Sequence, residues 1–235
     1  MPHFDRDLFN NFIVENRVVG FFDKPITLKS GRKSNWYVNW RTVSGDAFLI
    51  DRLADFLIDF IRDSNLEPDA FYGVPEGASK LGIIATYKWA KHSPGFGPGS
   101  HALPMGRGKP KEHGAAYDRF FLTAPRGRIV VVEDVTTTGQ SLLAALDQLK
   151  EAHVEVLAAV GLTNRMERRD DGASVEEAVK KLGVRYMEMS RATEFLPAAF
   201  REFRPGEEIG REIEREFAEY GLEPITLVDR ERSHQ

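Results

Sequence analysis

The sequence predicts an α/β fold in which helices flank a central, mostly parallel sheet. From residue 70 onward, apolar strand patterns alternate with amphipathic helix patterns, and this alternation is typical of parallel sheets whose strands are joined by helices. One of these strands, 128–133, ends in two adjacent acids followed by a Thr/Gly loop. Binding sites of open α/β sheets lie at the carboxyl ends of strands, so this junction is the expected site. A length of 235 residues suits one domain with additions better than two full domains.

The individual elements follow from the spacing of apolar residues, because intervals of three and four residues predict helices and alternation predicts strands. The predicted helices are 5–16, 46–62, 78–90, 141–152, 173–182 and 206–220. The predicted strands are 27–28, 36–40, 70–74, 128–133, 154–162 and 184–189. Loops are expected at the Pro/Gly-rich stretch 93–100 and at the flexible polar stretch 107–119.

Two apolar stripes lie outside the predicted parallel sheet. Trp36 and Trp40 lie on one side of a strand, and Ile209, Ile213 and Phe217 recur along the last helix. Stripes of this kind are more often core or subunit-interface positions than ligand-binding positions, and we expect the same here. The sequence suggests no functional role for the last helix or for the Pro/Gly-rich loop.

The composition is that of an ordinary soluble globular protein, with 42% apolar and 29% charged residues. No cysteine is present, which excludes disulfides and thiolate metal sites. The formal net charge of −4 gives no general nucleic-acid footprint. No stretch has the length of a membrane span, and the first residues lack the features of a signal peptide. We therefore expect a cytoplasmic protein that binds neither nucleic acid nor membranes.

The junction at 133–141 is the most specific signal in the chain. Glu133 and Asp134 end the strand, and their carboxylates suit the hydroxyls of a ribose, directly or through Mg²⁺. The loop that follows offers hydroxyls and unpaired backbone N–H groups to a phosphate at a helix start. Its candidate ligands are Thr136, Thr137, Thr138, Gly139, Gln140 and Ser141. An ordinary strand–turn–helix with Asp and Thr caps is the alternative, but paired acids before Thr-Thr-Gly are unusual for capping alone.

This junction resembles the loop with which type I phosphoribosyltransferases bind phosphoribosyl pyrophosphate (PRPP). The segment 28–34, Leu-Lys-Ser-Gly-Arg-Lys-Ser, precedes an aromatic strand and narrows the resemblance to the orotate phosphoribosyltransferases. By that resemblance, Lys29 contacts the anionic edge of the base. Considered alone, the segment is a basic turn between two strands.

A basic segment, 105–128, lies within this acidic chain and indicates a local anionic partner, although a solvated charged loop would look the same. Within it, 107–114 resembles the mobile hood loop of the family, which closes over the pyrophosphate of the neighbouring subunit. The resemblance implies a homodimer with shared active sites and gives catalytic or binding roles to Arg107, Lys109, Lys111 and His113. Cations there would stabilise the departing pyrophosphate. Gly108 stands where the family often has a second lysine.

Two further segments match the family by position. Arg165, in 163–167, would pair with the carboxylate of orotate as a bidentate guanidinium, and Asn164 replaces an acid typical of the family. A surface Arg/Glu turn is the alternative. Glu76 and Gly77 lie where the family has its pyrophosphate loop, and a plain helix N-terminus is the alternative there.

These motifs, in family order, imply transfer of the phosphoribosyl group of PRPP to orotate, giving orotidine 5′-monophosphate and pyrophosphate. The resemblance implies a type I phosphoribosyltransferase domain over 1–200, with a hood and base-binding region over 1–42, and a C-terminal helical extension and tail over 201–235. It also implies Mg²⁺ held mainly through PRPP, with Asp134 as a candidate ligand. Two alternatives remain open: a phosphoribosyltransferase for another base, and a regulator that binds PRPP without catalysis.

Overall fold

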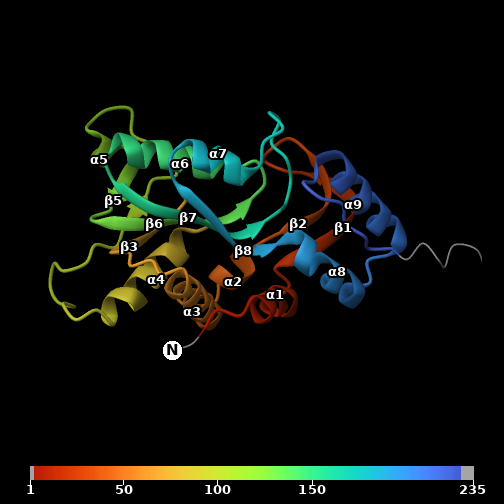
Figure 1. Cartoon of the computed structure of the whole chain (residues 1–235), viewed down its shortest axis with the longest axis horizontal. Coiled ribbons are helices and arrows are strands. Elements are labelled where there is room, and N and C mark those ends of the chain that lie inside the picture. The colour runs from red at the N-terminus through yellow and green to blue at the C-terminus, as the bar shows by residue number, and fades with distance from the viewer. Residues whose placement is uncertain (1–2, 229–235) are drawn as a thin grey trace, which may run out of the picture.

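A four-stranded parallel sheet forms the centre of the computed structural model, which describes residues 3–228 (Figure 1). The strands lie in the order β3 (Ala70–Gly73), β6 (Arg128–Thr136), β7 (Glu155–Asn164) and β8 (Arg185–Arg191). Each neighbouring pair is parallel. The predicted α/β class with a central parallel sheet is therefore confirmed.

Helices cover both faces of this sheet (Figure 1). The helices on one face are α6 (Gln140–Glu151) and α7 (Val175–Lys181), and those on the other include α3 (Ala47–Asp63) and α4 (Ser79–Lys91). Alternate residues of β6 belong to the two cores: Val131 packs on the α6 side and Val132 on the α4 side. Burial on both faces explains why β6 reads as a continuous apolar run.

A second group of elements lies beside the sheet and covers the carboxyl end of β7 (Figure 1). It consists of α1 (Arg6–Glu15), the antiparallel pair β1 (Val19–Thr27) and β2 (Lys33–Val38), the short α2 (Arg41–Ser44), α8 (Ala192–Phe203) and α9 (Glu207–Tyr220). Its apolar residues join the same core as β6 and β7. The first and last parts of the chain thus form one structural unit.

The two apolar stripes outside the sheet lie in the core. Trp36 and Trp40 are no more than 1% exposed, and Ile213 and Phe217 are buried as well. The rings of Trp36 and Phe217 stack with centroids 6.0 Å apart, which fixes α9 against β2. The prediction that these residues serve packing is confirmed.

Several elements differ from the sequence prediction. The structure has a helix, α8, where none was predicted, and the boundary predicted at residue 200 falls inside it. Strand β1 begins at Val19 rather than at residue 27, because an irregular register between Phe21 and Ile26 hides its alternation. The polar stretch 107–119 runs into a short helix, α5 (Ala116–Phe120), next to β4 (Met105–Gly106) and β5 (Phe121–Thr123). Residues 229–235, the last part of the C-terminal extension and tail predicted over 201–235, lie outside the described residues.

Among residues 3–228, none of the helices is long and apolar enough to cross a membrane.

Candidate active site

A pocket at the carboxyl ends of β6 and β7 joins segments that are far apart in the sequence. It is lined by residues from 28–30, 75–77, 133–141 and the position after β7. The predicted site residues that line it are Lys29, Glu76, Gly77, Glu133, Asp134, Thr137, Thr138, Gly139, Gln140, Ser141 and Arg165. The fold therefore places the predicted phosphate, ribose and base contacts around one cavity.

The phosphate end of this pocket is the loop between β6 and α6. Gly139 adopts φ 70°, and a Cβ at that position would lie 3.0 Å from Val175 Cγ1, so both the backbone angle and the space favour glycine. No side chain caps the N-terminus of α6. Its first backbone N–H groups therefore remain available to an anion, which the helix dipole also favours.

The two acids lie between this loop and the segment 75–77. Glu133 is 5% exposed, and burial, reinforced by the neighbouring Asp134, raises the pKa of Glu133 well above its usual range. Asp134 is half-buried, and its Oδ1 accepts a hydrogen bond from the Val135 N–H at 2.9 Å. A Cβ on Gly77 would lie 2.1 Å from Asp134 Oδ2. Glycine at position 77 is therefore what allows the pyrophosphate-loop segment to approach the acid.

Lys29 connects the base-binding segment to the phosphate loop. Its Nζ donates a hydrogen bond to Ser141 Oγ at 2.8 Å. The side chain is exposed and lines the pocket, so the ammonium can change partner when a ligand enters. The position is compatible with the contact to an anionic base that the family resemblance implies.

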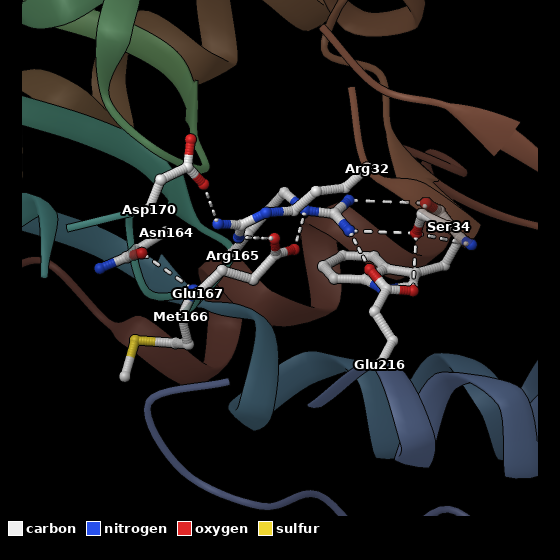
Figure 2. Close-up of polar contacts among 9 residues, drawn as sticks. Arg32, Ser34, Asn164, Arg165, Met166, Glu167, Asp170 and Glu216 are labelled. Carbon is white, nitrogen blue, oxygen red and sulfur yellow. Dashed lines mark hydrogen bonds and ion pairs between the residues drawn. The ribbon is translucent and has the colours of Figure 1, made fainter. Parts of the chain in front are cut away.

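Arg165 lies in a buried polar cluster at the base end of the pocket (Figure 2). Its Nε donates to Glu167 Oε1 at 2.6 Å, and its NH2 donates to Glu216 Oε1 at 2.8 Å. The guanidinium also stacks on Trp36, with its central carbon 3.6 Å from the ring centroid. The alternative of a surface Arg/Glu turn is wrong, since Arg165 and Glu167 are 1% and 2% exposed.

This cluster also limits what Arg165 can offer to a ligand. A bidentate pair needs two adjacent donors of the guanidinium, and here Nε and NH2 are both engaged by carboxylates. NH1 makes only a 3.5 Å hydrogen bond to the Trp36 carbonyl. Among the guanidinium nitrogens, NH1 is therefore the one that no carboxylate of residues 3–228 engages. A bidentate pair with a substrate carboxylate, as predicted from the sequence, does not fit this arrangement of Arg165.

Five of the predicted residues do not line this pocket. Thr136 is fully buried, and its hydroxyl shares a 2.7 Å hydrogen bond with Tyr186 Oη. Its side chain faces the interior because β6 continues to residue 136 instead of ending at 133. The other four are the hood cations Arg107, Lys109, Lys111 and His113, of which the last three are exposed.

The two departures from the family pattern have local structural settings. Gly108 lies beside Glu76, a residue that lines the pocket, and a Cβ on Gly108 would be 2.6 Å from Glu76 Oε1. Asn164 is buried, and its Oδ1 accepts a hydrogen bond from the Met166 N–H at 2.9 Å. Asn164 thus shapes the turn that positions Arg165.

Sequence reasoning missed three charged residues at this site. Arg41 lines the pocket from the start of α2, directly after the aromatic strand. Arg169 donates a hydrogen bond to the Thr138 carbonyl of the phosphate loop, and its charged neighbours gave no signal that singled it out. Of the three, Glu216 is the residue that the sequence could have indicated, because it is an acid within the apolar stripe of Ile213 and Phe217.

Comparison with known proteins places the chain in a family. No family model matches it. The orotate phosphoribosyltransferase of Bradyrhizobium diazoefficiens is 35% identical over 180 residues, covering 74% of this chain and 88% of the relative. The enzyme of that name from Bradyrhizobium sp. (strain ORS 278) is 38% identical over 176 residues, covering 73% and 88%.

Solved structures agree at the level of the fold. The crystal structure of orotate phosphoribosyltransferase from Francisella tularensis aligns with a TM-score of 0.65 at 19% identity, covering 91% of this chain and 99% of that one. The UMP synthase of Leishmania donovani aligns with a TM-score of 0.66 at 20% identity, covering 90% of this chain and 42% of that one. From the sequence identity and the extent of coverage, the chain belongs to the orotate phosphoribosyltransferase family.

Proposed function

We propose that the protein transfers the phosphoribosyl group of PRPP to orotate, giving orotidine 5′-monophosphate and pyrophosphate. The observation that carries the proposal is that one pocket holds a phosphate loop, an acid pair and a base end that includes Lys29 and Arg165. These parts match, in order, the 5′-phosphate, the ribose hydroxyls and the carboxylate of the base. Family membership gives the same substrates independently.

In this reaction the bond from ribosyl C1 to the diphosphate oxygen breaks and a bond from C1 to N1 of orotate forms. The proton on N1 of orotate leaves and is taken up by the departing pyrophosphate or by solvent. The ribosyl centre becomes cation-like, so catalysis depends on positioning and charge stabilisation rather than on a covalent nucleophile. Asp134 is placed to hold a ribose hydroxyl and to favour the positive charge. The raised pKa of Glu133 suits a carboxyl that donates a hydrogen bond as well as accepting one.

The donor set of the pocket fits a Mg²⁺ ion carried mainly by PRPP. Within residues 3–228, no group of three or more His, Asp or Glu side chains is arranged to hold a metal. A magnesium ion bound through phosphates needs only one or two protein carboxylates, and we propose Asp134 for that role. When bound, the ion would neutralise charge on the diphosphate.

We also propose that the active form is a homodimer in which the hood loop serves the neighbouring subunit. The supporting observation is that Lys109, Lys111 and His113 are exposed and do not line the pocket of their own chain. Cations from a partner would complete the pyrophosphate end. The cytoplasmic location expected from the sequence stays a prediction.

The test is pyrophosphate release from PRPP and Mg²⁺ with orotate, uracil, hypoxanthine and adenine in parallel. We expect turnover with orotate alone. Turnover with another base would leave the proposed role of the phosphate loop in place but would overturn the roles of Lys29 and Arg165. Tight binding of PRPP without turnover on any base would indicate the regulatory alternative.

A further inference from the structure

Helix α9 carries a buried acid that reaches the base end of the pocket. Glu216 is 9% exposed, and both of its oxygens accept hydrogen bonds (Figure 2). Oε1 accepts from Arg165 NH2 at 2.8 Å, and Oε2 accepts from Ser34 Oγ at 2.9 Å. A carboxylate is costly to bury without such partners, so the residue is more than a part of the helix's packing face.

The helix is joined to the loop that carries Arg165. The Arg168 N–H donates to the Tyr220 carbonyl at 2.7 Å, and the Leu222 N–H donates to the Met166 carbonyl at 2.8 Å. A β-bridge pairs Glu167 with Gly221. Glu216 is therefore held next to Arg165 by backbone contacts as well as by its side chain.

The charges of the cluster come from three segments. Arg165 and Glu167 lie after β7, Glu216 lies on α9, and Arg32 lies between β1 and β2, where it donates to Glu167 Oε2 at 3.0 Å and to Asp170 at 2.9 Å. Arg165, Glu167 and Glu216 are buried, the side chain of Arg32 is 9% exposed, and Asp170 is solvent-exposed. The charges shielded from solvent are therefore those of two arginines and two acids. With Glu216 ionised, these four sum to zero charge, so the cluster offers little net attraction to an incoming carboxylate.

We infer that Glu216 is a specificity-determining residue that acts as a resident carboxylate on Arg165 and sets how strongly the pocket attracts an anionic base. An ionised Glu216 occupies NH2 and neutralises part of the charge that a substrate carboxylate would otherwise meet. A neutral Glu216 leaves the cluster with a positive charge. The inference rests on the proposed function, because it concerns the site where orotate would bind.

The setting of Glu216 lets it change charge near neutral pH. Burial raises the pKa of Glu216 to about 7, with repulsion from Glu167 in the same direction and with Arg165 and Ser34 opposing. A substrate carboxylate placed at Arg165 adds a further negative charge and so favours the protonated form. Binding of an anionic base should therefore take up a proton at Glu216.

The experiment measures binding of orotate and of neutral uracil to the full chain by titration calorimetry between pH 6 and pH 8. It compares the wild type, Glu216→Gln and the control Glu208→Gln, an exposed acid on the same helix. The wild type should bind orotate more weakly as the pH rises, with proton uptake detected by repeating the titration in buffers of different ionisation enthalpy. At pH 8, Glu216→Gln should bind orotate roughly tenfold more tightly, without the pH dependence, and uracil binding should be the same in all three proteins.

Several outcomes would overturn the inference. Equal or weaker orotate binding by Glu216→Gln at pH 8 would mean that Glu216 only holds Arg165 in place. Absence of proton uptake by the wild type would also contradict the inference, and because it needs no variant, a misfolded variant does not decide the test. If either of these outcomes occurs but the wild type still binds orotate, the inference about Glu216 is wrong and the proposed function stands. If the wild type binds no orotate at any pH, both the proposed function and the inference are overturned.

Discussion

The phosphate end of the pocket is one uninterrupted segment, 133–141, whereas the base end is assembled from the turn at 28–34, the loop after β7 and helix α9. In the first region, residues that are neighbours in sequence are also neighbours in space, and the groups available to bind a phosphate are backbone N–H groups at the start of α6. In the second, Arg165 and Glu216 are 51 residues apart in sequence. We therefore expect the phosphate end to tolerate substitutions elsewhere in the chain, whereas the base end depends on the whole fold.

The largest expected effect is the loss of stability on removing Arg165 from the base end. Arg165→Met leaves the carboxylates of Glu167 and Glu216 buried without their partner, and removing one member of a buried ion pair typically costs about 3–5 kcal/mol. We expect a loss of that size in the free energy of unfolding measured in urea. Arg211→Ala is the control, because its pair with Glu207 is exposed and should change stability by less than about 0.5 kcal/mol. A loss below about 1 kcal/mol for Arg165→Met would argue against the view that the base end depends on the buried ion pairs of Arg165.

The next effect concerns the phosphate and ribose end, where we expect a substitution to lower the rate of the reaction and to leave the stability of the fold unchanged. Asp134→Asn keeps the shape of the side chain but removes its charge, and loss of one positioned electrostatic contact commonly lowers kcat by about 100-fold. Steady-state rates with PRPP and orotate measure it. Asp147→Asn, at an exposed position of α6, should keep normal turnover. Retention of more than about a tenth of the activity by Asp134→Asn would remove that residue from the catalytic set.

A third test uses pH to separate the two ends. The pKa of Glu216 rises from its ordinary 4.5 to about 7 in the folded protein, so the folded state holds this proton more tightly than the unfolded state. The stabilising effect of the proton is therefore complete below pH 4.5 and is lost as the pH rises through about 7. Between pH 5 and pH 8, wild-type stability should fall relative to Glu216→Gln by on the order of 2 kcal/mol. Parallel stability curves for the two proteins would contradict this.

The smallest effect concerns the contact between the acid pair and the pyrophosphate loop. A Cβ in Gly77→Ala would lie 2.1 Å from Asp134 Oδ2, so the loop or the acid must shift. Because displacements near 1 Å at a reacting centre are costly, we expect turnover to fall roughly tenfold. The matched control is Gly95→Ala, where nothing lies within 4 Å of the new atom. Equal rates for the two variants would show that the close approach has no catalytic importance.

The sequence alone predicted the parallel sheet and the binding junction after β6 because both depend on local patterns. Apolar runs bounded by turns define the strands, and Gly139 with its flanking hydroxyl residues defines the loop. Where the local pattern was ambiguous, the prediction failed. The acids at 133 and 134 end the apolar run and so predict a loop at Thr136, although β6 continues to that residue. The helix α8, which the sequence did not predict, contains Pro197, and proline is unusual inside a helix.

Only the tertiary structure decided what surrounds Arg165. Sequence spacing identified the arginine, but its partners Glu216 and Trp36 come from distant segments that meet because α9 packs its apolar face on β2. The tertiary structure also brought Gly77 against Asp134. Local pattern therefore determined the phosphate end, since backbone geometry at a helix start depends on nearby residues. Long-range packing determined the base end, because a buried charge needs partners that no local spacing can specify.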